Sequence, residues 1–522
     1  MGTCKIKCKR QKCRIVIIVF AILFILFAYK SWYHLYRKGP TIYDSQKVYG
    51  EYLRDVYLPK KYLDYDELTV DEQESIYELH FAEYLEENFK YGSIGAEKHE
   101  GLPYWLWLVL PRLFPDYLPG TGGYLSFGMV WEEGEPLPVG ISKKTIGYPR
   151  IGMNCAVCHT AAIRTVGNLD VPEIISGGAS SQFNHQAYLR FLFKCADDAR
   201  FRYDYIMATL NNMYDFSLFE RLLYRFIIIP QTKKKLIKQT MLYAWMDDRP
   251  DVGPGRVDLF NQTKFLTLGF PIDDTAGTSD MMPLWNNRYN NKKALHWDGL
   301  NSSLREVVLS SAIETGVKKS DIDTKSLNMV EEWIGNLPSV KYADYFPDNP
   351  VNNEEAGIGE KIFLKECALC HMAGHEKTGT VIPISEIGTD SHRLDLWSEK
   401  AAAALNKYMS RYKVKNFKKS DGYVATLLDG VWLSAPYLHN GSVPTLYDLL
   451  EPPENRPKIF HRGYNVYDPV KVGFIYDVPD EGSHDFFLFD TGIPANGNNG
   501  HIYGTKLPKK DKMALIEYLK TL

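Results

Sequence analysis

Two pentapeptides of the form Cys-x-x-Cys-His stand far apart in this 522-residue chain, at Cys155–His159 and Cys367–His371. In this spacing two thiols can bond covalently to the vinyl groups of one haem, and the adjacent histidine becomes an axial ligand of its iron. With 8 Cys and 13 His in the chain, two chance matches are not expected. The pattern predicts two covalent haem c groups. The residues predicted to hold them are Cys155, Cys158, His159, Cys367, Cys370 and His371.

Two other kinds of site use closely spaced cysteines. A zinc site needs further Cys or His at short spacing, and a thioredoxin-like redox pair does not require the trailing histidine. His375 follows His371 by four residues, but nothing comparable follows His159. Haem attachment is therefore the better interpretation of both pentapeptides.

The sixth ligand of each iron decides between electron transfer and substrate chemistry, because only an open position binds peroxide or dioxygen. For the second haem the candidates are Met409, His439 and His501, and spacing alone does not choose among them. For the first haem, His185 and His296 are possible distal groups. If either binds the iron, both haems are closed and the protein is an electron carrier.

Haem c is attached outside the cytoplasm, so an export signal is expected. Residues 1–14 contain six Lys or Arg and no acid, and an apolar run follows at 15–29. No small-x-small cleavage site comes next, and Trp32 and Tyr33 fit an interfacial aromatic belt. We expect an uncleaved anchor rather than a cleaved signal. This predicts a single-pass protein of the cytoplasmic membrane with its haem domains on the periplasmic or extracytoplasmic side.

Charge separates the N-terminal tail from the rest of the chain. Nine of the 61 basic residues lie within residues 1–40, which contain no acid, so the remainder carries 52 basic against 64 acidic residues. Such a surface gives no reason to expect nucleic-acid binding. It favours a donor protein with a basic docking patch.

Helical periodicity around the pentapeptides indicates the elements that position them. Residues 354–365 lead directly into Cys367, and 509–520 form a terminal amphipathic pattern able to cross that helix. Residues 326–337 are the counterpart for the first pentapeptide. We therefore predict a mainly α fold of two cytochrome c domains facing each other, with helical and loop insertions and an N-terminal membrane anchor. The predicted boundaries are tail and anchor 1–40, extension 41–150, haem domain 151–337, linker 338–350 and haem domain 351–522.

Several further segments resemble landmarks of the bacterial di-haem cytochrome c peroxidase superfamily. These are Leu295–Gly299 (LHWDG) and Ala435–Ser442 (APYLHNGS). Residues 462–473 and Gly500–Thr505 look closest to its rubber-oxygenase branch. The superfamily also includes the di-haem enzyme that matures tryptophan tryptophylquinone.

The resemblance implies roles for individual residues. Trp297 would lie between the haems, His501 would be the sixth ligand of the second iron, and His439 would lie near a propionate or near Trp297. The N-terminal haem would be the reactive one, and calcium between the domains is possible, as in several relatives. The branch places a Phe over the reactive haem, but here the stretch 310–316 has none, and Glu314 is its nearest carboxylate.

These expectations combine into a functional hypothesis. The chain would be an oxidoreductase of peroxidase or oxygenase type, passing electrons through Trp297 and activating peroxide or dioxygen at the first haem with Glu314 as proton donor. Its electron donor would be a small redox protein or a quinol-linked system. The main alternative is a non-enzymatic electron-transfer cytochrome with two six-coordinate haems. A weaker alternative is a membrane-tethered redox sensor.

Overall fold

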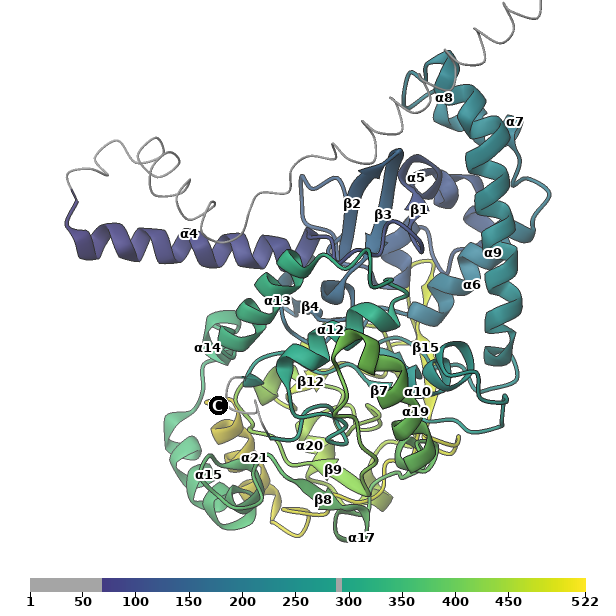
Figure 1. Cartoon of the computed structure of the whole chain (residues 1–522). Coiled ribbons are helices and arrows are strands. Elements are labelled where there is room, and N and C mark those ends of the chain that lie inside the picture. Colours follow the sequence, from purple (N-terminus) through teal and green to yellow (C-terminus); the bar gives the residue numbers. More distant parts are fainter. Residues whose placement is uncertain (1–67, 288–292) are drawn as a thin grey trace, which may run out of the picture.

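The computed structural model describes residues 68–287 and 293–522 (Figure 1). Helices make up 43% of the structure, and the described residues also form seven small sheets. The expected mainly α fold of two facing cytochrome c domains is therefore wrong. The physical reason lies in two β-hairpins, at residues 141–153 and 160–176, which flank the first pentapeptide in place of helices.

The expected single-pass membrane location is not supported either. Among the helices of residues 68–287 and 293–522, none is both long enough and apolar enough to cross a bilayer. The tail and anchor predicted at 1–40, and the start of the extension up to residue 67, lie outside the described residues.

A long helix opens the described chain. Helix α4 (Val70–Tyr91) begins at a capping box in which the Thr69 hydroxyl accepts from the Glu72 amide and the Glu72 carboxylate accepts from the Thr69 amide. It projects to one side of the molecule (Figure 1). Its inner end buries Leu85 and Phe89, and Phe89 stacks on Trp333 with ring centroids 4.2 Å apart. The helix is thus attached to the body by its C-terminal turns.

The first pentapeptide lies between two β-hairpins. Strands β2 (Ile141–Ile146) and β3 (Tyr148–Met153) turn at Gly147, which has φ 77°, and β1 (Leu102–Pro103) pairs with β3. Asn154 then caps the 3-10 turn η5 (Cys155–Val157) by accepting from the Ala156 amide at 3.0 Å. Strands β4 (Thr160–Thr165) and β5 (Asn168–Ser176) follow immediately. The helix that precedes the second pentapeptide has no equivalent here.

Helices form the outer layer of this half. The apolar run at 102–110 becomes β1 and α5 (Tyr104–Leu113), and Trp107 is fully buried against Tyr124 with ring centroids 4.1 Å apart. This segment is core. The other helices of the layer are α6 (His185–Asp197), α7 (Tyr203–Leu210), α8 (Leu218–Leu223), the π-helical turn η6 (Tyr224–Ile228) and α9 (Ile229–Tyr243).

The middle of the chain links the two pentapeptides. It contains β6 (Arg256–Val257), α10 (Leu259–Gln262), the π-helical turn η8 (Thr263–Thr267), β7 (Ser279–Asp280), α12 (Leu304–Glu314) and α13 (Thr324–Asn336). Helix α13 covers the stretch expected to be helical at 326–337. It packs against α4, and α12 ends at Glu314.

The second pentapeptide follows a pair of crossing helices. Helix α15 (Asn353–Glu366) leads into the short α16 (Ala368–His371), and α21 (Lys509–Leu519) crosses α15. The crossing is close at Gly359, where a Cβ would lie 2.0 Å from the Ala514 carbonyl oxygen. Both helices occur where the sequence pattern places them.

Shorter elements complete the C-terminal half. The helices are α17 (Ile384–Ile387), α18 (His392–Asp395), α19 (Glu399–Met409) and α20 (Leu446–Leu449). The strands pair as β8 (Val381–Pro383) with β9 (Gly422–Val424), β10 (Ile459–Arg462) with β15 (Phe487–Asp490), β11 (Tyr467–Asp468) with β12 (Gly473–Phe474), and β13 (Asp480–Glu481) with β14 (His484–Asp485).

The predicted linker at 338–350 is packed rather than open. It contains α14 (Tyr342–Tyr345), and both Tyr342 and Phe346 are buried edge-on against Trp432. These contacts fix how the segment lies on the C-terminal core. The boundaries assigned from sequence stay a prediction.

Candidate haem-binding cavity

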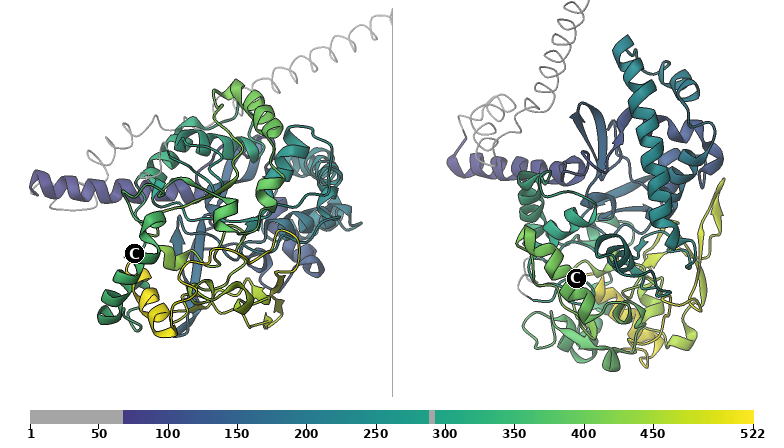
Figure 2. Two further views of the ribbon diagram at one scale, coloured as in Figure 1. Left: turned by 90° about the horizontal axis from the view of Figure 1, so that it is seen from below. Right: turned by 45° about the vertical axis from the view of Figure 1, so that its right-hand side comes forward.

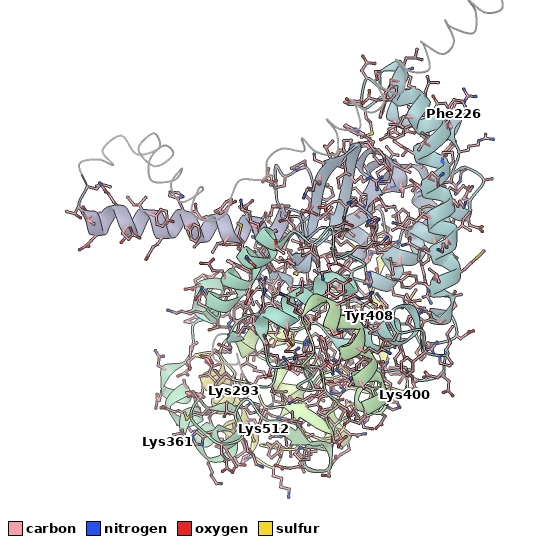
Figure 3. The ribbon with its side chains drawn as sticks, in the orientation of Figure 1. Phe226, Lys293, Lys361, Lys400, Tyr408 and Lys512 are labelled. Atoms are coloured by element: carbon pink, nitrogen blue, oxygen red, sulfur yellow. The ribbon has the colours of Figure 1, made fainter. Side chains whose placement is uncertain are left out.

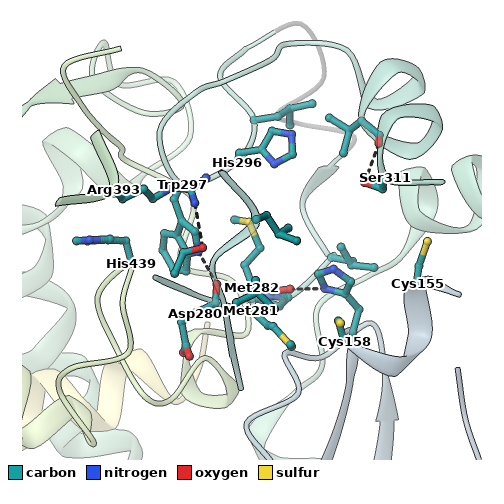
Figure 4. A pocket seen from close by; sticks show the side chains of 18 of the residues that line it. Cys155, Cys158, Asp280, Met281, Met282, His296, Trp297, Ser311, Arg393 and His439 are labelled. Carbon is teal, nitrogen blue, oxygen red and sulfur yellow. Dashed lines mark hydrogen bonds between the residues drawn. The ribbon is translucent and has the colours of Figure 1, made fainter. Parts of the chain in front are cut away.

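A single large cavity of about 1170 Å³ reaches both pentapeptides. Its lining also includes most of the other residues singled out from sequence, namely His185, His296, Trp297, Glu314, His439 and His501. In Figure 4, Trp297, His439 and Arg393 lie on one side of the cavity, Cys155 and Cys158 on the other, and Met281 and Met282 between them. The fold therefore brings together side chains that are hundreds of residues apart in sequence.

The two pentapeptide histidines are held in the same way. His159 Nδ1 lies 2.8 Å from the Met282 carbonyl oxygen, and His371 Nδ1 lies 2.7 Å from the Thr426 carbonyl oxygen. A carbonyl can only accept, so Nδ1 carries the proton in both rings and Nε2 is left with a free lone pair. Burial lowers the pKa of both histidines, which keeps the rings neutral. Each ring is thus prepared to bind a metal through Nε2.

The pentapeptide cysteines are thiols without metal-site or redox-pair character. All five cysteines in the described part of the chain are free. Burial raises the pKa of Cys155 to about 11 and that of Cys158 and Cys367 to about 12, and it also raises the pKa of Cys370. A reactive or metal-binding cysteine normally has a lowered pKa. The raised pKa values of these buried thiols therefore do not favour a thiolate metal site or a redox pair.

His501 faces His371 across the second site. Their ring centroids are 6.3 Å apart. A metal–imidazole bond is about 2 Å long and the centroid lies about 1.1 Å behind the ligating nitrogen, so two imidazoles on opposite sides of one iron have centroids roughly 6 Å apart. The observed separation leaves room for one metal ion between the rings.

The other two candidates for this position differ from His501. Met409 is completely buried in an apolar cluster with Leu405 and Trp397 and does not line the cavity. His439 lines it, but its Nε2 lies 2.9 Å from the Tyr423 hydroxyl, and its Nδ1 is buried without a partner. An unpartnered nitrogen at the cavity wall suits a hydrogen bond to a propionate, the kind of contact expected for His439.

The loop that carries His501 is held by a buried arginine. Arg456 is 2% exposed and uses all five of its N–H donors on backbone carbonyls. Three of these carbonyls belong to Asn498, Gly500 and His501, at 2.6, 2.9 and 3.1 Å from the guanidinium. His501 itself has φ 46°, a conformation that a non-glycine residue rarely adopts. Arg456 thus stabilises an otherwise unfavourable backbone at the candidate ligand.

Two hydrogen bonds fix Trp297, one at its indole ring and one at its backbone carbonyl. Its indole Nε1 donates to the Asp280 carbonyl at 2.8 Å, and its own carbonyl accepts from the Val424 amide at 2.8 Å. The Asp280 carboxylate pairs with the buried Arg462 at 2.6 Å. Burial nevertheless raises the Asp280 pKa to about 6, with Arg462 acting in the opposite direction.

A histidine and a carboxylic acid also line the cavity that the first pentapeptide reaches. His296 lines the cavity with its Nε2 buried and unpartnered, has φ 64°, and has a pKa lowered to about 4, chiefly by burial. Glu314, at the end of α12, also faces the cavity, and burial raises its pKa to about 7. His185 lines the cavity too, at the N-terminus of α6, and burial lowers its pKa to about 4.

Arg393 is a residue that sequence reasoning missed. It is 6% exposed, donates to Ser279 Oγ at 3.0 Å and pairs with Asp298 at 3.3 Å, and its guanidinium lies over the Phe260 ring at 4.2 Å. Its charge helps to lower the pKa of the cavity histidines His296 and His439 after burial, the larger cause. No local pattern marks it, because its partners are about a hundred residues away.

Comparison with known proteins supports a haem-related interpretation. A family described as RoxA-like, cytochrome c-like matches residues 422–461, which include β9, Tyr423 and His439. The chain carries a cytochrome c-like region. Such a region implies covalent haem c and fits an oxidoreductase. The wider resemblance to the di-haem peroxidase superfamily stays a prediction.

Two proteins of Sinorhizobium fredii are also similar to this chain. The uncharacterized protein y4iM is 28% identical over 322 residues, which cover 52% of this chain and 71% of that protein. The uncharacterized protein y4iJ is 46% identical over 109 residues, covering 19% of this chain and 18% of that protein. Their names say nothing about what they bind.

The residues of the cavity fit covalent haem. The test rests on three observations, namely two neutral histidines with free Nε2 atoms, thiols that stay protonated, and unpartnered nitrogens of His296, His439 and His501 at the cavity wall. Calcium has no such support: within 68–287 and 293–522, no group of three or more His, Cys, Asp or Glu could hold a metal ion. It stays a prediction.

Proposed function

We propose that this protein is a di-haem c-type cytochrome that acts as an oxidoreductase. Cys155, Cys158 and His159 would hold one haem, and Cys367, Cys370, His371 and His501 the other. When bound, the haems supply electron transfer and, at an open iron position, reduction of peroxide or activation of dioxygen. The observation that carries the proposal is the shared cavity, in which both histidines present Nε2 and His501 lies opposite His371.

The protein residues between the sites have complementary roles. Trp297 would provide an aromatic contact between the two halves of the cavity, held in orientation by its hydrogen bond to the Asp280 carbonyl. Glu314, with a pKa of about 7, would hold a proton near neutral pH and deliver it to the reacting oxygen. Arg393, close enough to affect His296 and Glu314 electrostatically, would stabilise negative charge there. Electrons would come from a small redox protein or a quinol-linked donor.

A second candidate function is favoured by one observation. The buried, unpartnered Nε2 of His296 lines the same cavity as His159. If it occupies the remaining position at the first site, both haems are closed and the protein is an electron carrier.

One experiment separates the two functions. The oxidised full-length protein is examined by low-temperature electron paramagnetic resonance with and without azide, after its haem content has been counted by mass spectrometry. We expect two haems per chain, one of which changes its spectrum with azide. Two low-spin, unresponsive haems would favour the carrier, and a single haem would contradict the di-haem proposal.

A further inference from the structure

A helical arm projects from the body on the side away from the second pentapeptide (Figures 1 and 2). It is the continuous helical stretch of α8, η6 and α9, residues 218–243. Helix α9 packs on α6, whereas α8 and η6 form the outer part. Phe226 lies near this outer end (Figure 3).

The outer part of the arm exposes large apolar side chains. Leu218, Phe219, Leu222 and Phe226 are 75%, 71%, 47% and 66% exposed. Leu218, Leu222 and Phe226 follow one another at intervals of four and Phe219 precedes Leu222 by three, so the four side chains border one face of the helix. Single exposed apolar residues are ordinary, but a contiguous group marks an interaction site.

The charge of the arm indicates which partner fits. Residues 218–243 contain six Lys or Arg and one Glu, although the chain after residue 40 is acidic. Arg225 is exposed and its guanidinium lies over the rings of Tyr203 and Phe226, at 5.2 and 5.5 Å. Lys234 and Lys238 are exposed further along. Positive charge therefore borders the apolar face.

We propose that this arm docks on an anionic phospholipid surface. The apolar side chains would enter the boundary between headgroups and acyl chains, while the exposed Arg225, Lys234 and Lys238 meet lipid phosphates. A second copy of the chain fits less well, because a two-fold interface would place this basic surface against itself. The inference rests on the arm alone and does not depend on the proposed redox function.

Docking would also bring the cavity close to the lipid surface. Lys235, Lys238 and Leu242 of α9 line the cavity as well as belonging to the arm. A donor or reactant carried in the membrane would thus meet the protein on the side where α9 borders the cavity.

The test measures amide hydrogen exchange in the segment 217–228 of the full-length holoprotein, by mass spectrometry. Vesicles of phosphatidylcholine alone are compared with vesicles that also contain phosphatidylglycerol. We expect the anionic vesicles to slow exchange in this segment about tenfold relative to the neutral ones. Residues 1–40 are the same in every variant and so cannot cause a difference between variants.

Two double variants make the test specific. Phe219→Glu with Phe226→Glu should abolish the slowing, while Val166→Glu with Val171→Glu, at positions 66% and 64% exposed on the β4–β5 hairpin, should retain it. Equal slowing in both double variants would overturn the proposal. So would slowing that appears without vesicles as the protein concentration rises, since this would identify a second copy as the occupant.

Discussion

Replacing Arg456 by lysine should loosen His501 without removing any cavity residue. The guanidinium makes five hydrogen bonds to carbonyls, and three of them hold the loop from Asn498 to His501. Lysine keeps the charge but has only three donors on one nitrogen, so it cannot satisfy carbonyls that Arg456 reaches from three separate nitrogens. At least two of the five bonds are lost.

The size of the effect follows from these bonds. A hydrogen bond from a charged donor contributes about 1.5 kcal/mol or more, so the loss of two weakens the loop by about 3 kcal/mol. About 1.4 kcal/mol corresponds to a factor of ten in an equilibrium constant. The equilibrium between the loop that holds His501 in place and the released loop should therefore shift roughly 100-fold toward release. The φ of 46° at His501 acts in the same direction, because the loop is free to relax once the carbonyls are released.

The assay is competition between His501 and added imidazole in the oxidised holoprotein. Imidazole is titrated while the spectrum of the second haem is followed, and we expect the apparent affinity to rise roughly 100-fold in Arg456→Lys. The matched control is Arg462→Lys, since Arg462 is buried to a similar degree, 3% against 2%, but bonds to Asp280 and the Gly441 carbonyl instead. Its titration should match that of the unaltered protein.

Two results would refute this reasoning. An unchanged imidazole affinity in Arg456→Lys would show that the loop does not depend on the guanidinium. An equal increase in Arg462→Lys would show that any loss of a buried arginine loosens the site through general destabilisation. Urea unfolding of both variants measures that general effect separately.

Three further predictions concern other parts of the molecule. Glu314→Gln should lower peroxide turnover about 10²-fold or more and remove a decline in activity as pH rises through about 7. Because the pKa of Glu314 is raised from its ordinary 4.5 to about 7, the stability it contributes is fully present below pH 4.5 and is lost as the pH rises to 7, since the unfolded chain releases this proton first. Urea unfolding should therefore show the unaltered protein losing at most about 3.4 kcal/mol relative to Glu314→Gln over that range. Trp297→Phe should slow inter-haem electron transfer in stopped-flow measurements while both haems stay attached; an unchanged rate would contradict the role of the indole. Gly359→Ala should destabilise the fold by more than about 2 kcal/mol, since its Cβ would meet the Ala514 backbone, whereas Gly357→Ala, with open space at Cβ, should stabilise it by about 0.5–1 kcal/mol; urea unfolding distinguishes the two.

The helices around the second pentapeptide were predictable because local signals agree there. Residues 354–365 combine helical periodicity with Asn352, whose side chain accepts from the Glu354 and Glu355 amides. The first pentapeptide was assigned to a similar helical domain from the helical pattern at 326–337, which lies far from it in sequence and says nothing about the residues next to it. The sequence did contain a contrary signal, since a short run rich in β-branched residues ends at Gly147 and becomes β2, with β3 directly after it.

In the candidate site, too, some residues could be named from local sequence patterns and others could not. The candidate covalent and ligating residues could be named from sequence because haem attachment imposes fixed spacing on Cys and His, and their roles stay a prediction. Their supporting groups were not, because the carbonyls of Met282 and Thr426 could come from any residue type, 123 and 55 positions away from their histidines. Arg456 is equally inconspicuous, since it bonds only to backbone.

The two sites differ most on the face opposite the pentapeptide histidine. His501 is held opposite His371 by a loop that Arg456 ties down with three carbonyl contacts. His296 also has a positive φ, but within residues 68–287 and 293–522 no single buried cation bonds the carbonyls of its neighbours. Arg393, whose charge affects His296, bonds the side chains of Ser279 and Asp298 instead. A histidine without such a clamp is the easier one to displace. The exchangeable position should therefore be at the first site, beside Glu314, whichever of the two functions the protein serves at rest.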